Sequence, residues 1–136
     1  MMVFDRIWSF LQIVLHLASD PVNLLLLFGS VILGIIFGAM PGLTSTLGVA
    51  LLTALTYGMD TSLAMVVLLA IYVGGTYGGS YASILINIPG TAAAAATALD
   101  GYPLACKGEG GRAIGLTTTA SAIGTSISII FVVAIS

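Results

Sequence analysis

Two Pro-Gly pairs interrupt apolar stretches of this 136-residue sequence, and hydroxyl side chains follow each pair. Residues 41–46 read Pro-Gly-Leu-Thr-Ser-Thr, and residues 87–91 read Asn-Ile-Pro-Gly-Thr. A helix that begins just after such a break exposes unpaired backbone N–H groups, which carry a partial positive charge. With hydroxyl donors beside them, these groups can bind an anion without Lys or Arg. Hydroxyl oxygens and freed carbonyls are also ligands that Na⁺ accepts in unwound membrane helices.

Broken backbone at membrane depth is tolerated only where protein or a watery cavity satisfies its polar groups, which favours a binding role for both breaks. The alternative is structural, because Pro-Gly pairs also make ordinary tight loops and membrane Ser and Thr often bond to their own backbone. In the binding interpretation, Gly42 allows close approach of a ligand. The residues expected to line a solute or ion site are Gly42, Thr44, Ser45, Thr46, Asn87, Gly90 and Thr91.

The composition is that of a membrane protein. Hydrophobic residues make up 59% of the chain and charged residues 6%, against roughly 25% charged residues in soluble domains. Uncharged stretches cover residues 21–59, 61–99 and 113–136. A span needs about 20 apolar residues, so each of the first two stretches holds two short spans, or one span and a re-entrant segment. The third holds one span. We expect an all-α, polytopic fold with broken or re-entrant helices.

Residues 3–19 are expected to form an amphipathic helix. The polar positions Asp5, Ser9, Gln12, His16 and Ser19 draw one stripe at the helical period. Such a helix lies in the membrane interface, or packs beside a bundle with its stripe toward water. A cleaved signal peptide is the alternative, but the stripe interrupts the apolar region that such a peptide needs. We therefore divide the chain into an interfacial helix, 1–20, and a membrane domain, 21–136.

Local signals place the helices of the membrane domain. Asp20 is suited to cap a helix whose first residue is Pro21. A second helix is expected over 44–56, after the first break. Gly58 is then suited to a left-handed helix cap, and Asp60 to the next helix start.

Glycines four residues apart recur within residues 34–38 and 74–79. This spacing allows two helices to cross closely, although the second group is also compatible with an unwound hairpin tip. After the second break, an alanine-rich helix is expected to stop at residues 100–103, Asp-Gly-Tyr-Pro. A polar loop over residues 100–112 would follow.

The inventory of side chains excludes several functions. Three basic residues cannot form a phosphate-binding patch, so no nucleic-acid partner is expected. Cys106 cannot make an internal disulfide, and with His16 it is too isolated to bind a metal. No nucleophile, base and acid can be assembled, which disfavours an enzyme. Because the uncharged stretches contain no cation, cation-coupled uptake of an anion is favoured over a simple anion pore.

Several blocks of the sequence resemble the large permease subunit of the tripartite tricarboxylate transporters, the TctA family. The most specific are Asn-Ile-Pro-Gly at 87–90 and Asp-Gly-Tyr-Pro at 100–103. The chain departs from the family at Thr44, where a glycine is usual, and at Ala92, where a proline is common. The matching blocks follow the family order at residues 34–43, 55–60, 72–80, 84–91, 97–103 and 107–113.

The resemblance implies cation-coupled uptake of tricarboxylates or related carboxylates across a bacterial inner membrane, with Na⁺ or H⁺ as coupling ion and no other cofactor. It implies two partners, a small membrane subunit and a periplasmic solute-binding protein. Family members are several times longer, so residues 21–136 would form an incomplete half of a larger permease. The alternative is a small membrane interaction protein that assembles through its glycine ridges and transports nothing, or a non-functional fragment.

Overall fold

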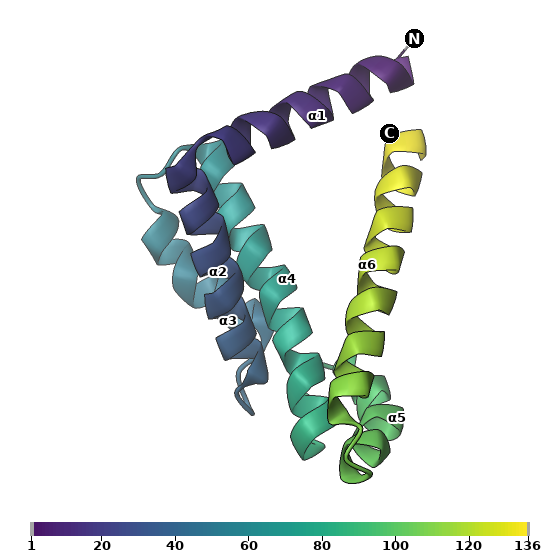
Figure 1. The fold of residues 1–136 in the computed structure, drawn as a ribbon. Coiled ribbons are helices and arrows are strands. Elements are labelled where there is room, and N and C mark those ends of the chain that lie inside the picture. Colours follow the sequence, from purple (N-terminus) through teal and green to yellow (C-terminus); the bar gives the residue numbers. More distant parts are fainter. Residues whose placement is uncertain (1, 136) are drawn as a thin grey trace.

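The computed structural model describes residues 2–135, and this part of the chain contains helices and no strand (Figure 1). For residues 2–6, 10, 18, 133 and 134, only the backbone is described. The elements are α1 (Met2–Ser19), α2 (Pro21–Ala39), α3 (Ser45–Thr53), the 3₁₀ helix η1 (Ala54–Thr56), α4 (Thr61–Ile86), α5 (Ala94–Cys106) and α6 (Gly110–Ile135).

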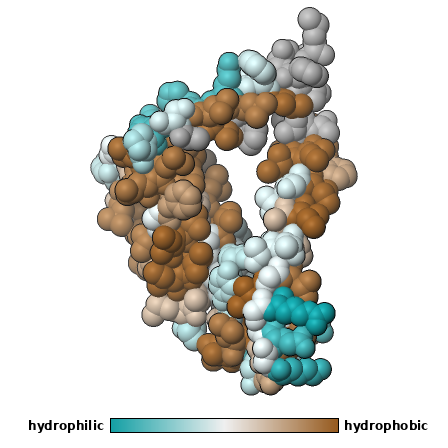
Figure 2. All heavy atoms as spheres, in the orientation of Figure 1, coloured by the Kyte–Doolittle hydropathy of each residue, from teal (hydrophilic) through white to brown (hydrophobic). Residues whose placement is uncertain are grey.

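Three of the described helices are long and apolar enough to cross a membrane: α2, α4 and residues 110–132 of α6. Helices α3 and α5 are too short to span. Each of the first two uncharged stretches therefore contains one span followed by a Pro-Gly break and a short helix. This confirms the prediction of an all-α membrane protein with broken helices. Hydrophobic side chains cover much of the surface seen in Figure 2.

The predicted helix starts are confirmed. The Asp20 carboxylate accepts a hydrogen bond from the backbone N–H of Val22 at 3.0 Å, and Asp60 accepts one from Ser62 at 3.0 Å. Gly58, with a φ of 95°, turns the chain between η1 and α4. These signals are local, because each involves residues within one helical turn.

Helices α2 and α4 form the most extensive packing in the molecule, and they meet backbone to backbone. A Cβ atom at Gly34 would lie 2.3 Å from the carbonyl oxygen of Ile71, and one at Gly78 would lie 2.2 Å from that of Ile35. α4 stays helical through this region, so its glycines make a helix crossing and no hairpin tip. Asn23 near the start of α2 and Ser62 near the start of α4 line one cavity, and Gly38 near the end of α2 touches Gly75, so the two helices run parallel (Figure 1).

The chain reverses direction twice around the end of α4. Asn87 caps α4 in the left-handed conformation, with a φ of 57°. The following non-helical residues return along α4, and Thr91 lies against Gly79. α5 then runs down beside α4 again, with Gly101 against Ile84. The second break is thus a short re-entrant excursion alongside a span.

The predicted stop at residues 100–103 is wrong. α5 continues through Pro103 to its end at Cys106. Small residues at one helical face, Ala94, Ala98 and Gly101, are buried where α5 packs against its neighbours. This packing outweighs the hydrogen bond that Pro103 cannot donate. Local sequence could not show that α5 continues past residues 100–103, because the packing that favours its continuation is with another helix, α4.

The polar loop predicted over residues 100–112 is shorter in the structure, where it consists of the three residues 107–109. α6 then returns antiparallel to α5 and is linked to α4 by a hydrogen bond between the hydroxyls of Tyr77 and Thr118. Beyond this point α6 diverges from α4, and α1 crosses above the space between them (Figure 1). Figure 2 shows this space as an opening through the molecule.

Candidate functional site

The first Pro-Gly break makes the turn from α2 into α3. Gly42 takes a φ of 87°, a conformation that side chains other than hydrogen rarely adopt. Thr44 caps α3, because its Oγ1 accepts a hydrogen bond from Leu47 N at 3.2 Å. The same hydroxyl is 2.8 Å from Thr46 Oγ1, and both threonines are exposed. The tip of this break therefore presents two hydroxyls beside the first turn of a helix.

Ser45 lies on the inner side of the same turn. It is only 5% exposed, and a Cβ atom at Gly75 of α4 would lie 2.7 Å from its own Cβ. Its hydroxyl makes no hydrogen bond with any residue that the structure describes. The first residue of α3 is thus held against α4, and its hydroxyl is not used by the fold.

The second break also packs where α2 crosses α4. A Cβ atom at Gly90 would lie 2.3 Å from the carbonyl oxygen of Gly38 and 3.1 Å from the Cα of Gly79. Thr91 contacts Gly79 through its side-chain methyl group, and its Oγ1 accepts from Ala94 N at 3.3 Å. The glycine at position 90 is therefore required by close approach of three backbone segments.

The two breaks, far apart in sequence, converge on one crossing. Gly38 and Gly75 touch there, because a Cβ at Gly38 would overlap the carbonyl of Gly75. Gly79 lies seven residues from the end of α4, about 10 Å along the helix axis. We call this cluster the junction, and it consists of Gly38, Ser45, Gly75, Gly79, Gly90 and Thr91.

The junction combines two kinds of polar group and contains no charged residue. The last carbonyls of α2, including that of Gly38, have no partner within their helix and carry a partial negative charge. The first N–H groups of α3 carry a partial positive charge. Ser45 adds a hydroxyl in the first turn of α3, and Thr91 adds one beside Gly79 of α4. The arrangement offers oxygen ligands for a small cation and hydrogen-bond donors for an anion.

The seven residues predicted to line a site divide into two groups. The structure brings Ser45, Gly90 and Thr91 together at the junction. The other four, Gly42, Thr44, Thr46 and Asn87, are exposed and lie outside it. Sequence reasoning did not assign Gly38, Gly75 and Gly79 to the site, although their four-residue spacing predicted the crossing on which the breaks converge.

A separate cavity of about 370 Å³ lies between α5 and α6. Thr97 and Asp100 line it from α5, and Thr117 lines it from α6. Elsewhere on α5, interaction with the Cys106 side chain raises the pKa of the half-buried Tyr102 phenol above its ordinary value. Among the described residues, no three His, Cys, Asp or Glu side chains gather as a metal site would need.

Known proteins resemble this chain over most of its length. The family model described as the tripartite tricarboxylate transporter TctA family matches residues 24–136. An uncharacterized 52.8 kDa protein in the TAR-I ttuC' 3' region of Agrobacterium vitis is 41% identical over 97 residues. The aligned part is 71% of this chain and 19% of that protein, so the chain spans about a fifth of this relative. No solved structure matches significantly.

Proposed function

We propose that this chain, which belongs to the tripartite tricarboxylate transporter TctA family, forms part of the solute path of a cation-coupled carboxylate permease. Family membership makes it a multi-pass component of a membrane transporter and not an enzyme. The carboxylate solute, the coupling to Na⁺ or H⁺ and the bacterial inner membrane location belong to the proposal.

Convergence of the two breaks at the junction is the observation that carries this proposal. Loops that merely connect spans have no reason to meet, and backbone that leaves the helical path inside a membrane needs polar partners. In secondary transporters, such broken helices supply the groups that bind solute and coupling ion. Ser45 and Thr91 bring hydroxyls to this convergence from two different breaks.

The partial charges at the helix ends suggest where the coupling ion and the solute carboxylate bind. The C-terminal end of α2, with the Gly38 carbonyl, favours a cation, and the hydroxyls of Ser45 and Thr91 add oxygen ligands beside it. The exposed start of α3, with Thr44 and Thr46, favours a carboxylate. We therefore assign the coupling ion to the junction and the solute carboxylate to the outer tip of the first break.

A longer polypeptide and two further subunits complete the proposed system. The chain spans about a fifth of its Agrobacterium vitis relative, so further helices would contribute to the permease. The family name describes a tripartite transporter. The proposed partners are a small membrane subunit and a periplasmic solute-binding protein that delivers the carboxylate.

The test is uptake of labelled carboxylate by the complete reading frame, expressed with both partner subunits. Ser45→Ala removes a hydroxyl that the fold does not use. We expect the cation concentration for half-maximal uptake to rise roughly tenfold, as for a lost oxygen ligand. Protein abundance in the membrane should not change. The matched control is Ser126→Ala, which removes an α6 hydroxyl that bonds only to the carbonyl of Ala122 in the described structure.

An unchanged cation dependence in Ser45→Ala would remove the coupling ion from the junction. Thr91→Val provides a second arm, because valine keeps the methyl contact with Gly79 while removing the hydroxyl. This variant also loses the bond from Ala94 N, so its thermal stability must be measured beside its uptake.

The alternative of a membrane protein that only assembles through glycine ridges is less well supported. The ridge glycines Gly34, Gly38, Gly74 and Gly78 are all in contact within the chain, where α2 meets α4. They are therefore not available to a partner helix. Stable oligomers together with no uptake by the complete reading frame would favour this alternative.

A further inference from the structure

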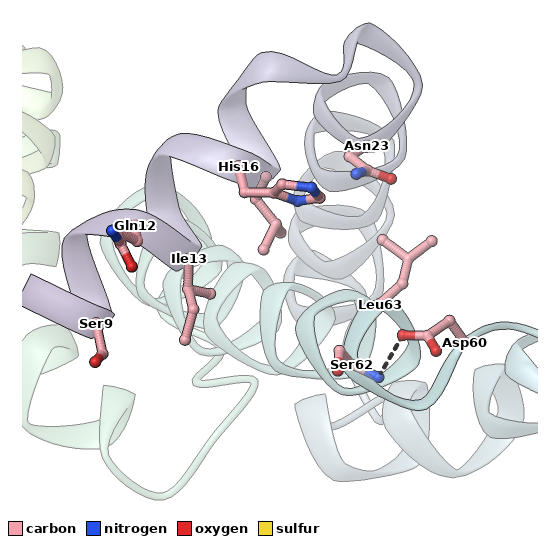
Figure 3. A pocket seen from close by; sticks show the side chains of 9 residues that line it. Ser9, Gln12, Ile13, His16, Asn23, Asp60, Ser62 and Leu63 are labelled. Carbon is pink, nitrogen blue, oxygen red and sulfur yellow. Dashed lines mark hydrogen bonds between the residues drawn. The ribbon is translucent and has the colours of Figure 1, made fainter. Parts of the chain in front are cut away.

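A cavity of about 640 Å³ lies where α1 meets the first turns of α2 and α4 (Figure 3). It is at the end of α2 opposite to the junction. Its volume is within the range of small-ligand pockets. Polar side chains of its wall come from three helices and one helix cap: Ser9, Gln12 and His16 of α1, Asn23 of α2, Ser62 of α4, and Asp60, which caps α4.

The cavity explains the polar stripe of α1. Three of the stripe residues, Ser9, Gln12 and His16, line it, so this part of the stripe faces the other helices across a hollow. The side chain of Asp5 lies outside the described residues. Ser19 bonds to the carbonyl of Leu15 in its own helix.

The position of the cavity is that of a membrane surface. α1 lies across the ends of the spans α2 and α4, both of which begin here (Figure 1). Large apolar side chains are exposed on α1, among them Trp8 and Leu15, and on α2, where Leu25 and Phe28 point outward. A transverse helix with exposed Trp and Leu is typical of the interface between headgroups and acyl chains.

The charges of the wall select one class of ligand. Among the described side chains that line it are one carboxylate, Asp60, and one imidazole, His16, and no Lys or Arg. A multivalent carboxylate would meet a negative charge without a fixed cation, which separates this cavity from the proposed solute site. A quaternary ammonium is best held by the rings of Trp, Tyr or Phe, and the described lining residues include none of these. A primary ammonium, by contrast, can donate hydrogen bonds to a carboxylate.

We propose that this cavity binds the headgroup of phosphatidylethanolamine. One oxygen of Asp60 already caps α4 through Ser62 N, and the other accepts from the lipid ammonium. The amides of Gln12 and Asn23 donate to the phosphate. Apolar side chains of the wall, Ile13 and Leu63, contact the start of the acyl chains.

Binding can be measured through Trp8, the only tryptophan of this chain. The 136-residue chain in detergent micelles is titrated with small amounts of phosphatidylethanolamine carrying brominated acyl chains, which quench tryptophan fluorescence. Brominated phosphatidylcholine and phosphatidylglycerol are titrated in parallel. We expect saturable quenching by phosphatidylethanolamine at a roughly tenfold lower concentration than by either other lipid, the ratio expected of one charge-assisted hydrogen bond.

Asp60→Asn tests the role of the carboxylate without removing the helix cap, because asparagine caps helices as well as aspartate. We expect this variant to lose the tenfold preference for phosphatidylethanolamine over phosphatidylcholine. Asp20→Asn is the matched control, since it makes the same change at the cap of α2, outside the cavity wall. It should keep the preference.

Three outcomes would overturn the proposal. Equal quenching by all three lipids would show that the cavity does not select a headgroup. Tighter binding of phosphatidylglycerol would indicate an anionic ligand. Equal loss of preference in Asp20→Asn and Asp60→Asn would assign the effect to surface charge. None of these results depends on whether the junction carries the coupling ion.

Discussion

The distance between α2 and α4 is set at single positions where a side chain would meet backbone. At Gly78, an added Cβ would collide with the carbonyl of Ile35, which cannot move without shifting its helix. At Gly124 of α6, nothing lies within 4 Å of the same atom. One methyl group therefore has opposite consequences at two glycines of the same chain.

Gly78→Ala should separate the two helices and lower the free energy of unfolding by about 1–3 kcal/mol, the cost of overpacking. Gly124→Ala should be neutral or stabilising by up to about 1 kcal/mol, because alanine favours the helix and meets no obstacle. Thermal unfolding in detergent, followed by circular dichroism, measures both. Equal melting temperatures for the two variants would contradict the backbone contact at position 78.

At the scale of elements, what could be predicted from sequence depends on where the determining contact lies. The starts of α2 and α4 follow from Asp20 and Asp60, since each cap bonds within one turn. The end of α5 depends on Gly101, whose contact with Ile84 joins residues on two helices. Local signals at residues 100–103 therefore predicted a stop that long-range packing overrides.

Pro103→Ala tests whether α5 is continuous. Within a helix, alanine restores an N–H that can bond to the Leu99 carbonyl and removes the clash of the proline ring. We expect the free energy of unfolding to rise by about 1 kcal/mol or more, with slower amide hydrogen exchange around residues 99–106. If the segment were a turn, proline would be favourable there and the substitution would lower stability instead.

The same reasoning applies to the candidate site. Its outer residues could be proposed because Pro-Gly followed by hydroxyls is a local pattern, and the structure places Ser45 against Gly75 and both Gly90 and Thr91 against Gly79. The α4 residues of the junction, Gly75 and Gly79, could not be assigned to the site from sequence, because only the fold shows which part of α4 the breaks contact.

At the scale of the whole molecule, α6 is the least constrained span. Its apolar window has no buried residue, and the hydrogen bond from Tyr77 to Thr118 joins it to α4 near one end. The opening seen in Figure 2 lies beyond this bond, between α4, α6 and the crossing helix α1. Loss of the bond should therefore change the position of α6 more than the stability of the α2–α4 pair.

Tyr77→Phe removes this bond and keeps the aromatic ring. Spin labels at Leu69 of α4 and Ile127 of α6, both exposed, report the separation of the helices in a background where Cys106 is replaced by serine. We expect the distance distribution to broaden in Tyr77→Phe. Tyr72→Phe, an exposed tyrosine on the same helix, is the control. Identical distributions for all three proteins would contradict the prediction.

The parallel course of α2 and α4 has a consequence for where the ligands of the proposed permease would bind. Two consecutive spans that run the same way place both of their starts at one membrane face and both Pro-Gly breaks toward the other. In the proposed permease, solute and driving ion would then bind in the same half of the membrane. Two ligands bound in one half of the membrane can be exposed to the same compartment together, which suits cation-coupled uptake.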